Sequence, residues 1–193
     1  MNWKSLHGKQ KIQYIWDYYK LPIVVFLIFL YIIGYTVHGH FSKKETLLYI
    51  GLVNVSAGEQ LTTELSDGFI DFIDADASKE ELKLYTGLFL TDDPHDPNHA
   101  YADASRLKIL ASIDDEQLDI VLMNKEAFDA FSQNEYLCEI EDYPEGILIS
   151  QKGIFKNAGI SGDVYLGVVK NSPRLDMAAE YINYLSSEQC CDF

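Results

Sequence analysis

Polar side chains stand at the ends of three predicted strands, and their types suit the binding of a small ligand. The first strand ends at Asn54 and Ser56, the third at Asn124, and the last at Lys170 and Ser172. Each end leads into a predicted helix, whose first backbone N–H groups lack partners within the helix and favour anions and carbonyl oxygens. If the strands are parallel, these ends share one edge of the sheet, where open α/β sheets bind ligands.

We therefore predict that these five residues line one ligand-binding site. The expected ligand is small and polar, and Lys170 offers a positive charge for a carboxylate or a phosphate. The alternative is that each residue only caps the helix that follows it, since Asn and Ser are common at the first position of helices.

Catalytic sequence patterns are few in this chain. Ser105 and Lys108 have the S-x-x-K spacing of penicillin-binding enzymes, but the accompanying S-D-N and K-T-G motifs are absent. The sequence also contains no C-x-x-C, no H-E-x-x-H and no phosphate-binding loop. We expect a protein without enzymatic activity, with no catalytic residues and no cofactor.

Residues 91–103 form an acidic segment whose residue types are able to ligate a metal ion. Pro94 and Pro97 interrupt it, and the D-x-D-x-D-G spacing of a calcium loop is missing. Pro97 also opposes a helical pairing of His95 with His99. We expect a solvated acidic loop here and no metal site.

The segments that position these residues alternate between strand and helix patterns. Short apolar runs rich in β-formers predict strands, and apolar residues at helical spacing predict helices between them. Residues 136–153 predict one or two further strands around a turn. The alternation is typical of an α/β domain with a mixed, mostly parallel sheet. The predicted strands are 46–55, 81–90, 118–124 and 164–171, and the predicted helices are 57–73, 104–116, 125–135 and 172–185.

A long apolar run lies between Lys20 and Lys43. Its 22 residues contain no Asp, Glu, Lys or Arg, and as a helix they extend ~33 Å, enough to cross a hydrocarbon core. A cleaved signal peptide fits less well, because its apolar part is usually about 7–15 residues long. We predict a transmembrane helix over residues 21–42 that anchors the chain in the lipid bilayer.

The charges on either side of this run predict its orientation. Residues 1–20 carry four Lys and one Asp, whereas the residues after them carry 11 Lys and Arg and 29 Asp and Glu. Lys and Arg are retained on the cytoplasmic side of a membrane. The prediction is a single-pass protein of the cell membrane, with a cytoplasmic leader over 1–20 and an extracellular domain over 45–193.

The acidity of the predicted domain limits its partners. The residues after the leader have a formal charge of −18, and nucleic acid requires a basic surface. The same charge opposes docking on anionic lipid. The three Cys are too few and too unevenly spaced to make a disulfide scaffold. We expect no nucleic acid among the partners.

Two stretches of the chain resemble bacterial extracellular solute-binding proteins of ABC transporters. They are "RLKILASIDDEQLDIVLMNKEAFDAFSQNEYLCEIEDY" (106–143) and "VYLGVVKNSPRLDMAAEYINYLSS" (164–187). The segment "KIQYIWDYYKLPIVVFLIFLYII" (11–33) is similar to the anchors of small, uncharacterised membrane proteins of Gram-positive bacteria. The resemblance implies a three-layer domain of the periplasmic-binding-protein-like type, with a membrane permease or an envelope protein as a further partner.

These observations favour a membrane-anchored, extracytoplasmic α/β domain that binds or senses a small polar ligand. The alternative is a non-enzymatic interaction or accessory protein that uses the same fold to contact a membrane or cell-envelope partner. A bound ligand stabilises the folded state by mass action, so ligand-induced stabilisation distinguishes the two functions.

Overall fold

The computed structural model describes residues 21–22, 24–34, 44–139, 146–150, 153–158, 160 and 162–187. The chain divides into two compact units, Met1–Lys43 and Lys44–Phe193. The second unit begins one residue before the predicted domain over 45–193, and it contains all the strands that the structure describes. The predicted leader over 1–20 lies outside the described residues.

The N-terminal helix corrects the prediction of a membrane anchor. Of the predicted helix over 21–42, the structure describes residues 21–22 and 24–34 as helical, and residues 23 and 35–42 lie outside the described residues. Within the described part of the chain, the structure contains no helix with the length and apolar character needed to cross a membrane. The predictions of a transmembrane helix over 21–42 and of a single-pass protein with a cytoplasmic N-terminus and an extracellular C-terminus are therefore wrong.

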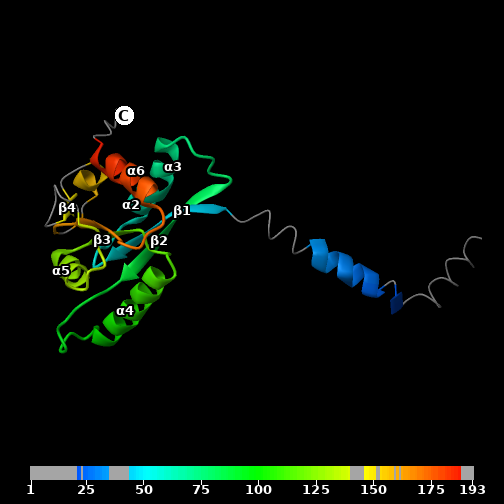
Figure 1. The fold of residues 1–193 in the computed structure, drawn as a ribbon, viewed down its shortest axis with the longest axis horizontal. Coiled ribbons are helices and arrows are strands. Elements are labelled where there is room, and N and C mark those ends of the chain that lie inside the picture. The colour runs from blue at the N-terminus through cyan, green and yellow to red at the C-terminus, as the bar shows by residue number, and fades with distance from the viewer. Residues whose placement is uncertain are drawn as a thin grey trace, which may run out of the picture. The chain divides into compact units, whose positions relative to one another are not determined.

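A five-stranded mixed sheet forms the centre of the second unit (Figure 1). β1 is parallel to β2 and to β3, whereas β5 is antiparallel to β3 and to β4. The α/β class and the mixed sheet agree with the prediction, but β5 runs opposite to its neighbours. In spatial order the strands are β2 (Glu80–Leu88), β1 (Glu45–Val53), β3 (Ile120–Met123), β5 (Tyr165–Val168) and β4 (Ile147–Leu148).

One face of the sheet packs against α2 (Glu59–Thr63), η2 (Glu64–Gly68), α3 (Phe69–Phe72) and α6 (Leu175–Ser186). Successive residues of a strand point to opposite faces, so every second residue of β1 enters this core. The helices contribute apolar side chains that meet them, as the helical spacing of the sequence predicts. The central members of this core, each at most 4% exposed, are Leu48, Ile50, Leu52, Leu61, Leu65, Phe69, Tyr181 and Tyr184.

The opposite face packs against α4 (His99–Asp114) and α5 (Lys125–Gln133). Figure 1 shows these two helices on one side of the sheet and α2, α3 and α6 on the other. α4 begins at His99, directly after its N-cap Asn98, so it starts inside the segment predicted as a loop over 91–103. The residues of this second core include Val53, Val121, Met123, Ile109, Phe128 and Phe131.

Two tyrosines of α6 hold the π-helical turn η2. Tyr181 Oη donates a hydrogen bond to the Leu65 carbonyl at 2.9 Å, and Tyr184 Oη donates one to the Glu64 carbonyl at 2.7 Å. A buried tyrosine hydroxyl needs such a partner. Burial raises the pKa of Tyr181 well above its usual value and raises the pKa of Tyr184 to about 12. Both hydroxyls therefore remain protonated donors at neutral pH.

Candidate functional site

The antiparallel direction of β5 separates the five predicted site residues into two groups. Ile120, the first residue of β3, pairs with Val168, the last residue of β5. Lys170 and Ser172 therefore follow β5 near the beginning of β3, whereas the other three predicted residues follow the ends of β1 and β3 at the opposite edge. The prediction of one shared site is wrong, because it assumed that all these strands are parallel.

Asn54 and Asn124 do meet at the ends of β1 and β3. Asn54 Nδ2 donates to Asn124 Oδ1 at 3.2 Å and to the Leu90 carbonyl at 2.7 Å, and Asn54 Oδ1 accepts from the Leu90 N–H at 2.8 Å. Asn124 Oδ1 also accepts from the Ala127 N–H at 3.0 Å and so caps α5. Asn54 has a φ of 57°, which Asn tolerates better than most residues. The pair therefore holds together the backbone segments that follow β1, β2 and β3.

Ser56 and Lys170 are both exposed. The N-cap of α2 is Gly58, which makes no side-chain capping bond, so Ser56 does not cap this helix. Lys170 donates its backbone N–H to the Tyr136 carbonyl at 2.8 Å, which ties the end of β5 to the segment after α5. Both side chains lie on the surface.

Ser172 belongs to a buried ionic network at the other edge of the sheet. Asp119 is fully buried and accepts from Ser172 Oγ at 2.6 Å, from Arg174 Nη1 at 3.1 Å and from the Tyr49 N–H at 2.8 Å. The Arg174 guanidinium also lies 4.8 Å from the centre of the Tyr49 ring. These bonds connect β1, the start of β3 and the start of α6. Removal of either charged partner leaves the other charge without compensation, which is costly at a buried site.

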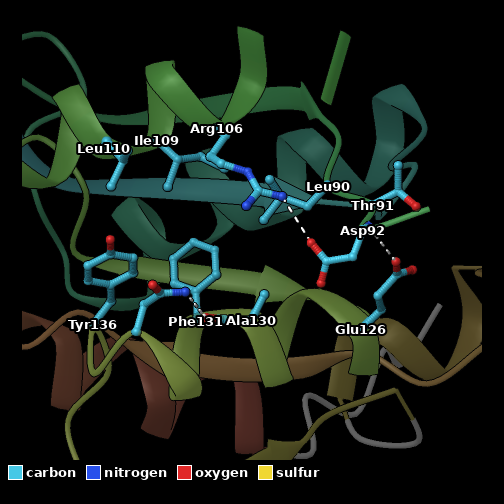
Figure 2. Close-up of a pocket in the computed structure, with 11 residues that line it drawn as sticks. Leu90, Thr91, Asp92, Arg106, Ile109, Leu110, Glu126, Ala130, Phe131 and Tyr136 are labelled. Carbon is cyan, nitrogen blue, oxygen red and sulfur yellow. Dashed lines mark hydrogen bonds and ion pairs between the residues drawn. The ribbon is translucent and has the colours of Figure 1, made fainter. Parts of the chain in front are cut away.

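A cleft of about 180 Å³ lies between α4 and α5 (Figure 2). Apolar side chains from both helices face each other across it, and charged side chains gather at one end, with Tyr136 toward the other. This combination of an apolar lining with a few convergent polar groups is typical of small-molecule sites. The lining residues are Leu90, Thr91, Asp92, Arg106, Ile109, Leu110, Glu126, Ala130, Phe131, Asn134 and Tyr136.

The charged end of the cleft is built from three segments. Arg106 Nη2 of α4 lies 3.1 Å from Asp92 Oδ1 in the segment after β2, and the Asp92 N–H donates to Glu126 Oε1 of α5 at 3.4 Å. The Arg106 and Asp92 side chains are 49% and 76% exposed, so water screens their ion pair and it contributes little to stability.

Helical spacing places the lining residues toward the cleft. Arg106, Ile109 and Leu110 stand at positions i, i+3 and i+4 of α4, which lie on one face of a helix. Glu126 and Ala130 stand four residues apart on α5. The short side chain of Ala130 leaves space opposite α4, where a larger residue would fill the cleft. These spacings are visible in the sequence, but nothing in the sequence alone brings the two helices together.

The weaker sequence motifs do not assemble into sites. Ser105 is buried and accepts from the Phe89 N–H at 3.2 Å, whereas Lys108 is exposed and lies 5.2 Å from the centre of the Tyr85 ring. The S-x-x-K residues thus point to different partners. No group of three His, Cys, Asp or Glu side chains within the described ranges is arranged to hold a metal ion.

Comparison of this chain with protein-family models, with curated proteins and with solved structures finds no match. The resemblance to solute-binding proteins therefore stays a prediction.

Proposed function

We propose that the unit Lys44–Phe193 is a non-enzymatic binding domain that holds a small ligand in the cleft between α4 and α5. The observation that carries this proposal is the composition of the cleft, which combines an apolar lining with charged groups at one end. The function agrees with the prediction of a ligand-binding α/β domain. The site differs from the predicted one, because it lies between two helices and not at the strand ends.

The volume of the cleft supports a ligand with a body of about one ring. A cavity of about 150 Å³ in another protein binds benzene, and this cleft measures about 180 Å³. Ligand sites for drug-sized molecules are larger, at about 300–1,000 Å³. The expected ligand is therefore smaller than a nucleotide or a disaccharide, and its apolar part lies between Ile109 and Phe131.

The residue types in the cleft support binding over catalysis. An activated Ser, Cys or Lys beside a base is one common arrangement for nucleophilic catalysis, and none of these three residue types stands among the described residues that line the cleft. The hydroxyl of Thr91, which does line it, accepts from the Asp93 N–H at 3.2 Å. The remaining polar groups suit recognition of a charged ligand group.

Binding at the cleft is tested with a variant that fills it. Ala130→Leu places a larger side chain between the helices, and Leu has a high helix propensity, so α5 should persist. Ala104→Leu on the exposed side of α4 is the matched control. A fragment library is first screened by thermal shift on the full-length protein. Bound fragments should stabilise the wild type and Ala104→Leu, and Ala130→Leu should lose this effect. Equal stabilisation of all three proteins would place the ligand elsewhere.

A second candidate function is contact with a protein partner through the outer surface of α4. Leu107 is 70% exposed and Tyr101 is 54% exposed on this helix, and exposed large apolar side chains are one feature of interaction surfaces. Leu107→Lys should then weaken binding to the partner and leave the thermal stability of the protein unchanged. Retention of partner binding by this variant would count against the candidate.

A further inference from the structure

We infer that the ligand of the α4–α5 cleft is a small organic cation, an ammonium group on an apolar body of about one ring, and that Glu126 holds its charge. This inference rests on the proposed function, because it names the ligand class of the same cleft. It follows from the charges at one end of the cleft, from the partners that each of them already has and from the apolar lining.

Among the described residues that line the cleft, Glu126 is the carboxylate without a cationic partner. Its Oε1 accepts a long hydrogen bond of 3.4 Å from the Asp92 N–H, and no Lys or Arg of the described chain lies within ion-pair distance of it. The neighbouring Lys125 pairs instead with Asp129, and it lies over the Phe128 ring. The negative charge of Glu126 is thus available to a ligand.

Arg106 does not make the cleft a site for anions. Its guanidinium is paired with Asp92 at 3.1 Å, so a ligand carboxylate would have to displace Asp92 and approach Glu126 as well. Two carboxylates and one guanidinium leave this end of the cleft with a net negative charge. An ammonium group neutralises that charge and keeps the Arg106–Asp92 pair intact.

The whole chain favours the same ligand charge. Its formal net charge is −15, and a strongly negative protein concentrates cations near its surface and accelerates their association. The apolar lining then selects among cations, because a simple metal ion or ammonium ion gains nothing from Ile109 and Phe131. The ring of Tyr136, toward the other end, adds an aromatic surface for the ligand body.

Three matched probes test the ligand class by isothermal titration calorimetry on the full-length protein near neutral pH. They are 2-phenylethylamine, 2-phenylethanol and 3-phenylpropionate, which share one ring and differ in charge. We expect the amine to bind more tightly than the alcohol by about two- to fivefold, because Glu126 is exposed and water screens an ion pair at its carboxylate. The carboxylate should bind more weakly than the alcohol.

Glu126→Gln tests the assigned residue, and Glu180→Gln on the exposed surface of α6 is the control for net charge. Gln keeps the acceptor for the Asp92 N–H, so the fold should persist in the first variant. Glu126→Gln should remove most of the preference for the amine and leave the affinity for the alcohol unchanged, whereas Glu180→Gln should change neither.

The results separate this inference from the proposed function. Equal binding of amine and alcohol by the wild type, lost in Ala130→Leu, would overturn the ligand class and leave the cleft as a binding site. An equal loss of amine binding in Glu126→Gln and Glu180→Gln would overturn the role of Glu126. Binding of none of the three probes would overturn the inference as stated.

Discussion

The contact between η2 and α6 leaves no room for a side chain at position 68. A Cβ built on Gly68 lies 2.4 Å from Tyr184 Oη, a distance that real Cβ atoms do not reach. The same hydroxyl donates to the Glu64 carbonyl at 2.7 Å. Gly68→Ala must therefore displace the Tyr184 hydroxyl from its acceptor.

The expected effect of Gly68→Ala on the free energy of unfolding is the sum of three contributions. Loss of one hydrogen bond costs about 1 kcal/mol, and the shift of a packed ring adds about 1–3 kcal/mol. Ala is better than Gly within a helix by about 0.5–1 kcal/mol, which offsets part of this cost. Gly68→Ala should lower the free energy of unfolding by about 1–3 kcal/mol.

Tyr184→Phe should reverse the sign of this effect. Without the hydroxyl, the nearest atom of the ring to the new Cβ is Cζ at 3.5 Å, which is an ordinary contact. Only the helix preference for Ala then remains, so Gly68→Ala should raise the free energy of unfolding by about 0.5–1 kcal/mol in this background. Tyr184→Phe alone should cost about 1 kcal/mol for the lost hydrogen bond.

Urea unfolding of the four proteins, followed by far-UV circular dichroism, measures the coupling between the two positions. We expect a coupling energy of about 1.5–4 kcal/mol. Gly58→Ala is the control, because a Cβ at Gly58 meets no atom within 4 Å and its effect should be the same with Tyr or Phe at position 184. An equal cost of Gly68→Ala in both backgrounds would refute the packing described for η2.

Further predictions concern pH, the buried network and the cap of α5. Burial raises the pKa of Tyr184 from about 10 in the unfolded chain to about 12 in the folded protein. Below pH 10 the hydroxyl is protonated in both states, so its contribution to the free energy of unfolding is constant. Above pH 10 the unfolded state loses the proton first, and the free energy of unfolding should fall toward pH 12. Tyr184→Phe should flatten this part of a pH series of urea melts, and an unchanged slope would contradict the burial. Asp119→Ala removes the buried acceptor of Ser172 Oγ, of Arg174 and of the Tyr49 N–H and should cost about 3 kcal/mol in the same melts, whereas a cost under about 1 kcal/mol would show that the network is dispensable. Asn124→Ala removes the acceptor of the Ala127 N–H and should lower the free energy of unfolding by about 1 kcal/mol without loss of ligand binding. Loss of ligand binding in this variant would show that Asn124 belongs to the ligand site.

Local patterns predicted most of the strands and helices but not the direction of β5. The run predicted as a strand over 46–55 contains most of β1, at Glu45–Val53. A short run of apolar β-formers predicts a buried strand whatever the position of that strand in the sheet. A short apolar strand such as β5 carries no mark of its direction in its own residues. That direction depends on how the chain returns after α5, which is a property of the tertiary fold.

The candidate site was missed for the same kind of reason. The cleft requires α4 and α5 to lie beside each other, and the prediction gave α4 a later start than His99. Asn124 shows the limit of the strand-end rule, since its side chain is used as a cap and as a partner of Asn54. What the sequence does contain is the spacing of Arg106 and Ile109 on one helical face.

The most direct test of a ligand site between α4 and α5 is the mapping of backbone amide shifts in ¹⁵N-labelled protein during titration with 2-phenylethylamine. We expect saturable shifts concentrated at Ile109, Leu110, Ala130 and Phe131, with little change at Ser172 and Asp119. Shifts concentrated around Ser172 and Asp119, or no saturable shifts at all, would contradict a ligand site between α4 and α5.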